Sequence, residues 1–100
     1  RYTSGMVDQQ KSVELTLSGQ VVGVGLRQWT QMTATQVGVA GWVRNNLDRT
    51  VTIHAEGPTE TVDAFVERLR RPRLEAVRVD DVQVRDIEAH GYSGFSVEWN

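Results

Sequence analysis

The spacing of apolar residues switches repeatedly between two periods along this chain, and the order of the switches limits the possible folds. Apolar and polar residues alternate, as in strands with one buried face, over 12–19, 39–46, 51–57, 76–88 and 94–99. Apolar residues recur every three or four positions, as in amphipathic helices, over 26–38 and 58–71. The predicted order is therefore strand, helix, strand, strand, helix, strand, followed by a short last strand.

This order contains two β-α-β halves, which is the ferredoxin-like split arrangement (βαββαβ) of the α+β class. We expect an antiparallel sheet that carries both helices on one face and turns the other face to solvent. Asp48 and Arg49 fall in the predicted turn between the second and third strands. The alternation slips by one residue at Asp80 and Asp81, which predicts a β-bulge or bend there.

The ends of both predicted helices carry recognisable residue types. Gly38 is expected to cap the C-terminus of the first helix. Pro58 suits the first turn of the second helix, and Thr59 or Thr61 is expected to cap its N-terminus. The second helix has the clearer apolar stripe, which consists of Val62, Phe65, Val66 and Leu69.

Length and composition indicate one globular domain, since the chain has 100 residues of which 39% are hydrophobic. We assign the domain to residues 12–100 and expect residues 1–11 to be a disordered N-terminal extension or a remnant of an expression vector. The chain contains no cysteine, which excludes disulfides and thiolate zinc sites. Its two histidines, His54 and His90, lie far apart in sequence, so we expect no bound metal and no cofactor.

The charge balance and hydropathy exclude some partners. A net charge of -2 argues against non-specific binding to nucleic acid. The sequence has no run of about 18 apolar residues, which a membrane span would need, and no signal-peptide pattern at its start. We therefore expect a monomeric cytoplasmic protein with neither a membrane nor a nucleic-acid partner.

Acidic residues are missing from one long segment of this acidic chain. Between Leu15 and Leu47 there is no Asp or Glu, and the only cations are Arg27 and Arg44. One interpretation is chance, combined with an apolar helix and strand. The other is an anion site, because a carboxylate beside a bound phosphate costs about 4 kcal/mol at 4 Å in a surface-like dielectric.

The stretch GQVVGVGLR, residues 19–27, favours the anion site. Gly19, Gly23 and Gly25 tolerate backbone angles that turn successive N–H groups into a concave nest. The helix that follows points its positive dipole end at the same place, and Arg27 in its first turn offers a planar fork for two phosphate oxygens. The alternative is a tight strand-to-helix turn with an exposed arginine. The spacing matches neither a Walker loop nor a dinucleotide fingerprint.

Four motifs resemble the acylphosphatase family when they are taken together. They are GQVVGVGLR at 19–27, GWVRN at 41–45, AEG at 55–57 and GYSGF at 91–95. The resemblance covers about residues 12–98, and it implies the same ferredoxin-like fold. It also implies hydrolysis, without a metal, of the carboxyl–phosphate mixed anhydride of a small-molecule acyl phosphate, with inorganic phosphate as a product.

The resemblance assigns a role to each residue of the site. The loop backbone and the arginine would bind the phosphate, which corresponds here to Val22, Gly23, Val24, Gly25, Leu26 and Arg27. Arg27 would be the binding side chain, and Asn45 would position the attacking water. On its own, an asparagine near a hairpin turn has a plain structural explanation.

The chain departs from the family pattern at four places. The family usually has Gln at the position of Val22 and Phe at the position of Leu26. The hairpin usually contains Asp-Gly where Asp48 and Arg49 stand, which leaves the turn type open. The connection after the second helix often has Gly-Pro, whereas this chain has Arg-Pro-Arg at 71–73.

The other polar and aromatic residues are interpreted structurally. His54 and His90 are expected to have no chemical role, and Arg44 is expected to point away from Asn45, because strand neighbours face opposite sides. Trp29, Trp42 and Trp99 are interpreted as packing residues. Arg68, Arg70, Arg71 and Arg73 are interpreted as a solvated helix end.

A second function class stays open from the sequence. The domain could be a non-catalytic module that binds an acyl or carbamoyl phosphate and was excised from a larger maturation protein.

Overall fold

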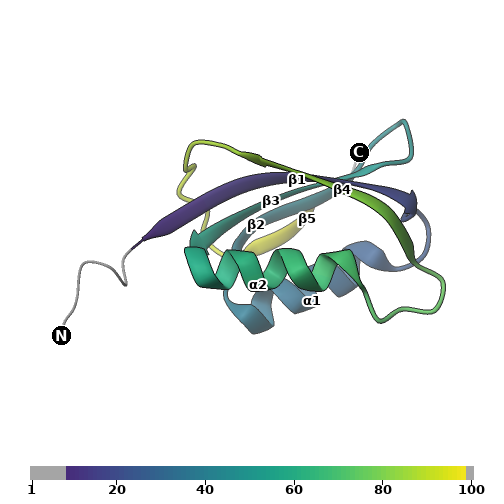
Figure 1. The fold of residues 1–100 in the computed structure, drawn as a ribbon, viewed down its shortest axis with the longest axis horizontal. Helices are drawn as coiled ribbons and strands as arrows, with labels where there is room; N and C mark the ends of the chain where they lie inside the picture. Colours follow the sequence, from purple (N-terminus) through teal and green to yellow (C-terminus); the bar gives the residue numbers. More distant parts are fainter. Residues whose placement is uncertain (1–8, 99–100) are drawn as a thin grey trace.

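A computed structural model describes residues 9–98 as two helices that cover one face of a five-stranded sheet (Figure 1). The elements are β1 (Gln10–Gln20), α1 (Leu26–Val37), β2 (Ala40–Asn45), β3 (Val51–Pro58), α2 (Thr59–Arg70), β4 (Arg78–Asp86) and β5 (Phe95–Glu98). Their order confirms the predicted ferredoxin-like α+β fold. The predicted extension, residues 1–11, lies largely outside the described residues, and β1 already begins at Gln10.

The strand order is β4-β1-β3-β2-β5, with β1 next to the middle of the sheet. The pairs β1–β4, β1–β3 and β2–β3 are antiparallel, as expected. The pair β2–β5 is parallel, so the expectation of a purely antiparallel sheet is wrong at this edge. The reason is the segment 87–94, which leaves β4 at one edge and brings the chain to the start of β2 at the other. There Gly41 N–H donates to Gly94 O at 2.9 Å, and β5 then runs alongside β2.

The core lies between the sheet and the two helices. On the central strands, Leu15 and Ile53 are opposite each other and fully buried. The predicted stripe of α2 packs against them, and Phe65 on this stripe meets Phe95 of β5 edge to face at 5.9 Å between ring centroids. Burial of each such side chain contributes about 1.5–3 kcal/mol.

The helix ends match the sequence in one case and differ in another. Gly38 caps α1 in the left-handed conformation, with φ 93°, and its N–H donates to Ala34 O at 2.8 Å. At the start of α2, however, the capping position is occupied by Pro58, so the cap expected from a threonine is wrong. The N–H of Thr59 instead donates to Gln9 O at 3.2 Å, which satisfies this helix end from the beginning of β1.

The predicted irregularity of β4 is a β-bulge at Asp80. Ser18 of β1 pairs with Asp81 and the next residue, Gly19, pairs with Val79, which leaves Asp80 as the extra residue. Gly19 has φ 126°, and a Cβ there would lie 2.3 Å from Arg78 O. Only glycine fits this close approach, and the bulge in β4 lies beside the end of β1 that leads into the glycine loop.

The β2–β3 hairpin closes with a residue in an unfavourable conformation. Asn46 O accepts a hydrogen bond from Arg49 N–H at 3.1 Å, and Asn46 N–H donates to Thr50 O at 2.8 Å. Arg49 has φ 69°, in the left-handed region that favours glycine. Because Asp48 does not have positive φ, this is not the two-residue type I′ turn; a turn over 46–49 ends in a left-handed residue, the position at which a G1 bulge has glycine.

Replacement of Arg49 by glycine should stabilise the fold by about 0.5–1 kcal/mol. A side chain in the left-handed region costs about 1–2 kcal/mol, but glycine loses more conformational entropy on folding, which offsets part of the gain. Chemical denaturation measures the change. Arg49→Ala is the matched control, since it removes the charge but keeps Cβ, and it should leave stability nearly unchanged. An equal gain in both variants would assign the effect to the charge instead.

Candidate active site

The glycine loop between β1 and α1 has the backbone geometry of an anion nest. Gly23 and Gly25 have φ of 77° and 82°, while Val22 and Val24 keep negative φ. This alternation turns successive N–H groups toward one side of the chain. A Cβ at either glycine would meet nothing within 4 Å, so it is the backbone conformation and not crowding that calls for glycine here.

The N-terminus of α1 continues the same concave surface. Gly25 is its capping residue, and no side chain forms a capping hydrogen bond at this end. The first turn contains no acidic residue. A capping side chain or a carboxylate would compete with an incoming anion for the N–H groups and the positive end of the helix dipole. This helix end is therefore suited to a phosphate.

Both predicted catalytic residues lie at this end of the sheet. Val51 of β3 pairs with Leu17 of β1 on one side and with Asn45 of β2 on the other, so Asn45 is about two strand spacings, or 10 Å, from β1. The loop leaves β1, crosses the end of β3, and enters α1, which packs on β2 and β5. Arg27 in the first turn of α1 is brought toward the same edge, and its side chain is half-buried.

The side chain of Asn45 points toward the helix layer. It lies on the same face of β2 as Val43, which is fully buried, and its Oδ1 atom is shielded from solvent. Arg44 lies on the opposite face, as expected, where its guanidinium carbon is 4.9 Å from the centroid of the Trp42 ring. This cation–π contact occupies Arg44 on the sheet face that is remote from the loop.

The residues that depart from the family pattern serve packing. Leu26 is 1% exposed and belongs to the core, and Val22 is half-buried against it. Neither substitution places a charged or polar side chain in the nest. The loop backbone retains the alternating φ values in their presence.

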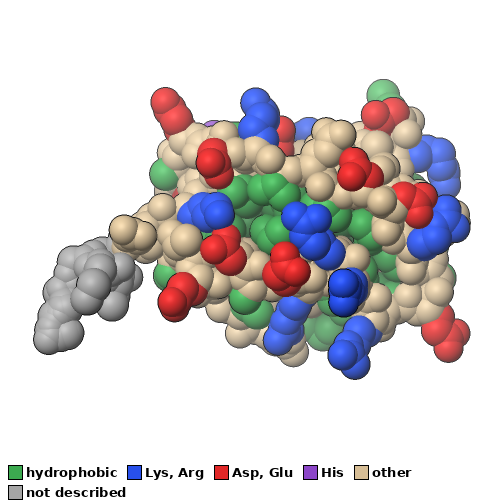
Figure 2. Space-filling model, in the orientation of Figure 1, with side chains coloured by type: hydrophobic (Ala, Val, Ile, Leu, Met, Phe, Trp, Pro, Cys, Tyr) green, Lys and Arg blue, Asp and Glu red, His purple; other side chains and the backbone are tan. Residues whose placement is uncertain are grey.

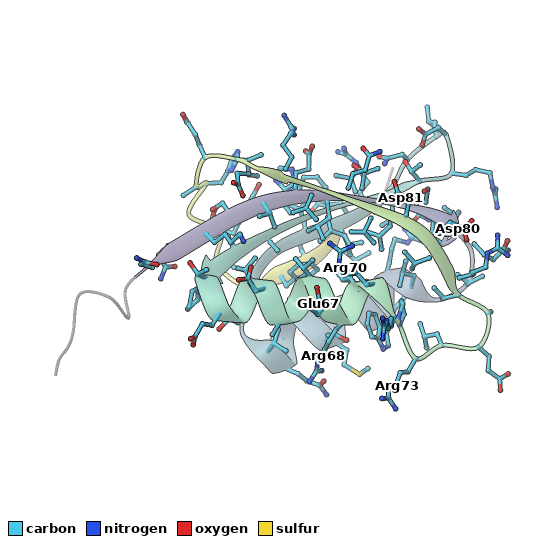
Figure 3. The ribbon with its side chains drawn as sticks, viewed as in Figure 1. Glu67, Arg68, Arg70, Arg73, Asp80 and Asp81 are labelled. Carbon is cyan, nitrogen blue, oxygen red and sulfur yellow. The ribbon has the colours of Figure 1, made fainter. Side chains whose placement is uncertain are left out.

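An acidic residue that the sequence placed far from the loop lies beside it in space. Asp80 at the β4 bulge is 3.2 Å, at its carboxyl carbon, from the position of a Cβ on Gly19. Its two oxygens accept hydrogen bonds from Arg78 at 2.8 and 3.2 Å. These hydrogen bonds are the main reason why the pKa of Asp80 is lowered. The guanidinium of Arg78 pairs with this carboxylate, whereas Asp81, which is the strand partner of Ser18, forms no ion pair among residues 9–98. Figure 3 shows Asp80 at the β4 end of the sheet.

The two histidines belong to the face of the sheet opposite the helices. His54 Nε2 donates to Glu14 Oε2 at 2.8 Å, and its ring stacks on Trp42 at 4.2 Å. Its Nδ1 faces the Tyr92 hydroxyl at 2.9 Å, and this hydroxyl accepts from Trp42 Nε1 at 3.1 Å. Hydrogen bonds from His54 and then Arg85 hold the pKa of Glu14 below its usual value. The network locates His54 away from Asn45, which agrees with a structural role.

Sequence analysis missed the residue that holds the segment after β4. The Glu56 carboxylate accepts N–H groups from His90, Gly91 and Tyr92 at 2.7, 2.8 and 2.9 Å, and the Ser12 hydroxyl at 2.9 Å. Burial raises the pKa of Glu56, but these hydrogen bonds outweigh it and the pKa ends below its usual value. The motifs AEG and GYSGF are thus joined to each other across the sheet.

Acid should destabilise the fold through Glu56 and Glu14. Because their pKa values are lower in the folded state than the unfolded value of about 4.3, both carboxylates contribute stability above that pH, which is lost as the pH falls further. In Glu56→Gln, the side-chain NH₂ group replaces a carboxylate oxygen and faces backbone N–H donors. This variant should lower the free energy of unfolding by about 1–3 kcal/mol at pH 7. It should also flatten the fall in melting temperature between pH 5 and pH 3, which scanning calorimetry measures.

Glu75→Gln is the control for this measurement, because Glu75 is exposed in the α2–β4 connection. It should leave both the stability at pH 7 and its acid dependence unchanged. Equal behaviour of the two variants would show that the Glu56 contacts contribute nothing to acid sensitivity.

Two further features bear on partners and metals. No helix within residues 9–98 is long and apolar enough to cross a membrane. In the same part of the chain, no group of three or more His, Cys, Asp or Glu side chains is arranged to hold a metal ion.

Fold and loop together define a small α+β domain in which a glycine loop of alternating φ leads from β1 into the uncapped N-terminus of α1. The acylphosphatase family model matches residues 13–97, and the chain belongs to the acylphosphatase family. An acylphosphatase from Methanospirillum hungatei is 41% identical over 87 residues, which cover 87% of this chain and 96% of the relative. The crystal structure of acylphosphatase from Bacillus subtilis superposes with a TM-score of 0.81 at 33% identity, over 90% of this chain and 99% of that one.

A larger protein contains a similar domain. The structure of full-length HypF in a phosphate- and nucleotide-bound form matches with a TM-score of 0.86 and 27% identity. The match covers 95% of this chain but 12% of that protein. The domain therefore occurs both in proteins of about this size and as a small part of a longer chain. The high coverage of the relatives named acylphosphatase favours a stand-alone acylphosphatase over a module of a longer chain.

Proposed function

We infer that the protein is an acylphosphatase, which hydrolyses the mixed anhydride of an acyl phosphate to a carboxylate and inorganic phosphate. The observation that carries this conclusion is the alternating backbone of residues 22–25, which leads into an N-terminus of α1 without a side-chain cap. This geometry occurs in a chain whose family membership is established over residues 13–97.

Phosphate binding is assigned to the loop and to one side chain. The N–H groups of residues 22–26 would donate to the phosphoryl oxygens, and the Arg27 guanidinium would hold two of these oxygens in its planar fork. The dipole of α1 adds to this field at the same point. Charge on the phosphoryl group is thereby stabilised before and during its transfer.

Water attack is assigned to Asn45. Its side-chain amide orients a water molecule in line with the bond between phosphorus and the acyl oxygen. A phosphorus–oxygen bond forms to the water as the bond to the acyl oxygen breaks, and the carboxylate leaves without needing a strong acid. An amide is a poor base, so the substrate phosphate accepts the proton of the water, as the family resemblance implies.

We also propose that the protein acts as a monomer in the cytoplasm. The three exposed large hydrophobic residues among those described are Met32, Leu47 and Val84, and they lie on separate elements. They form no single apolar patch of the kind that marks a permanent interface. Light scattering coupled to gel filtration measures the oligomeric state.

Arg27→Ala should lower kcat/KM for benzoyl phosphate by about 10²–10⁴-fold, because two charge-assisted hydrogen bonds are lost. Arg27→Lys should also be strongly impaired, since a point charge does not replace a planar fork. The assay contains EDTA, and wild-type turnover should persist in it. Arg44→Ala is the control and should remain active. Near-normal turnover by both Arg27 variants would contradict the site assignment.

Asn45→Ala should reduce kcat by about 10²–10³-fold and change KM little, because its amide acts on the attacking water rather than on bound substrate. Steady-state kinetics separates the two parameters, and phosphate binding by calorimetry should be retained. Circular dichroism checks that the variant is folded. A rise in KM with kcat unchanged would assign Asn45 to substrate binding instead.

The same assay decides the alternative of a module without turnover. Saturable phosphate binding by well-folded wild-type protein, combined with no hydrolysis of benzoyl phosphate, would favour a binding module over the enzyme.

A further inference from the structure

A groove of about 580 Å³ lies between α1 and the C-terminal end of α2. Trp29 and Met32 line it from α1, and Arg68, Arg71 and Arg73 line it from the opposite side. Its volume lies within the range of about 300–1,000 Å³ that is typical of small-molecule sites. The proposed hydrolysis of acyl phosphates makes no use of this groove.

The groove is separate from the glycine loop. Trp29 follows Arg27 by two positions, which corresponds to a rotation of about 200° around the helix axis. Trp29 and Met32 are on the α2-facing side of α1, whereas Gln31 donates to Phe95 O on the β5-facing side. Arg27, four residues before Gln31, belongs to that second side.

The three arginines of the groove form no ion pair with a carboxylate among residues 9–98. Arginine ion pairs elsewhere in these residues include Arg70–Glu67, Arg78–Asp80 and Arg85–Glu14. None of them involves the groove arginines, and Glu67, which also lines the groove, pairs with Arg70 at 3.3 Å. Figure 2 shows cationic side chains gathered along the lower front of the molecule.

A favourable interaction with the helix dipole does not account for the whole cluster. It applies to Arg68, which lies in the last turn of α2. Arg73 comes after the helix has ended, yet it lines the same groove. Figure 3 shows Arg68 and Arg73 on the side of α2 away from the sheet, and Arg70 on the side nearer to it.

The wall opposite the arginines combines the apolar side chains of Trp29 and Met32 with the polar side chains of Thr33 and Gln36. Met32 is 53% exposed, which is high for a large hydrophobic residue, and the half-buried Trp29 lies one helical turn before it. The arginine guanidinium groups and the Trp29 indole ring are planar and stack on planar partners. The flexible Met32 thioether adapts to partners of varied shape. The groove thus presents cations on one side and, on the other, an indole ring and a thioether beside two polar side chains.

We propose that this groove is a second binding site, for an organic polyanion of about nucleotide size that carries a flat apolar part. Arg68, Arg71 and Arg73 bind its phosphate or carboxylate groups, and the apolar part lies against Trp29 and Met32. The proposal goes beyond the hydrolysis of acyl phosphates, because the ligand occupies residues outside the site assigned to that reaction.

ATP without Mg²⁺ is the probe, since it combines a flat heteroaromatic ring with several negative charges. Isothermal calorimetry is performed in buffer with inorganic phosphate, which occupies the glycine loop. Wild-type protein should bind ATP saturably at one site. Tripolyphosphate, which lacks the flat part, should bind about tenfold more weakly. Absence of saturable ATP binding, or equal affinity for the two probes, would overturn the proposal.

Variants at the helix end locate the binding. Arg71→Gln and Arg73→Gln should each weaken ATP binding about tenfold, because each removes a charge-assisted contact. Arg49→Gln is the matched control: it makes the same charge change, but Arg49 lies in the β2–β3 turn, outside the groove. Its affinity should stay within about twofold of wild type.

Two results separate this site from the catalytic one. Arg27→Ala should retain ATP binding, and the Arg71 and Arg73 variants should retain hydrolysis of benzoyl phosphate, which also shows that they are folded. Loss of ATP binding in Arg27→Ala would place the probe in the glycine loop and contradict the proposal. An equal loss in Arg49→Gln and Arg71→Gln would indicate a diffuse charge effect and would contradict it as well.

Discussion

The position of β1 inside the sheet determines where the anion nest lies. β1 pairs with β3 on one side and with β4 on the other, so its end has no freedom to move sideways. The chain must nevertheless reach α1, which packs over β2 and β5, and it has only residues 21–25 for this crossing. A crossing this short needs backbone angles that side chains disfavour, and Gly23 and Gly25 provide them. The same angles turn N–H groups outward, so the connection and the binding site are one structure.

The two faces of the sheet differ in the interactions that they make. The helix face holds the apolar core and ends in Asn45 and the glycine loop. The opposite face carries a polar network in which Glu14 and Glu56 accept hydrogen bonds from partners far away in sequence. Because both carboxylates have pKa values lowered by these contacts, acid weakens the support of the last strand on this face. The residues proposed to bind phosphate lie on other elements, so the acid sensitivity of the fold arises outside the proposed site.

Local patterns in the sequence predict most of the elements, and long-range contacts account for what they miss. Periodicity was sufficient for the order of strands and helices, and the slip at Asp80 predicted the bulge, because both depend on neighbours in the chain. The parallel β2–β5 pair depends on where 87–94 is held, and the Glu56 carboxylate that holds it lies 34 residues from His90. No local signal marks that acceptor. Likewise, Arg49 in a left-handed turn follows from hairpin geometry that overrides residue preference.

The candidate site shows the same limit. Glycine spacing and the acid-poor segment indicated an anion site around Arg27, but they did not single out Asn45, which only the family resemblance did. The proximity of Asp80 to Gly19 was also hidden, because the acid-poor segment is continuous in sequence and β4 joins it only in the sheet. Residues that meet through strand pairing are the ones that a linear pattern leaves out.

The attachment of the C-terminal segment has a consequence for how the domain assembles. Glu56 belongs to β3, and the strand beside which β5 runs is β2, so the surface that receives residues 90–98 exists only once the hairpin of β2 and β3 has formed. That hairpin is the most local strand pair in the sheet and closes at little entropic cost. The topology therefore favours formation of the hairpin before attachment of residues 90–98, after which Phe95 completes its contact with Phe65 of α2.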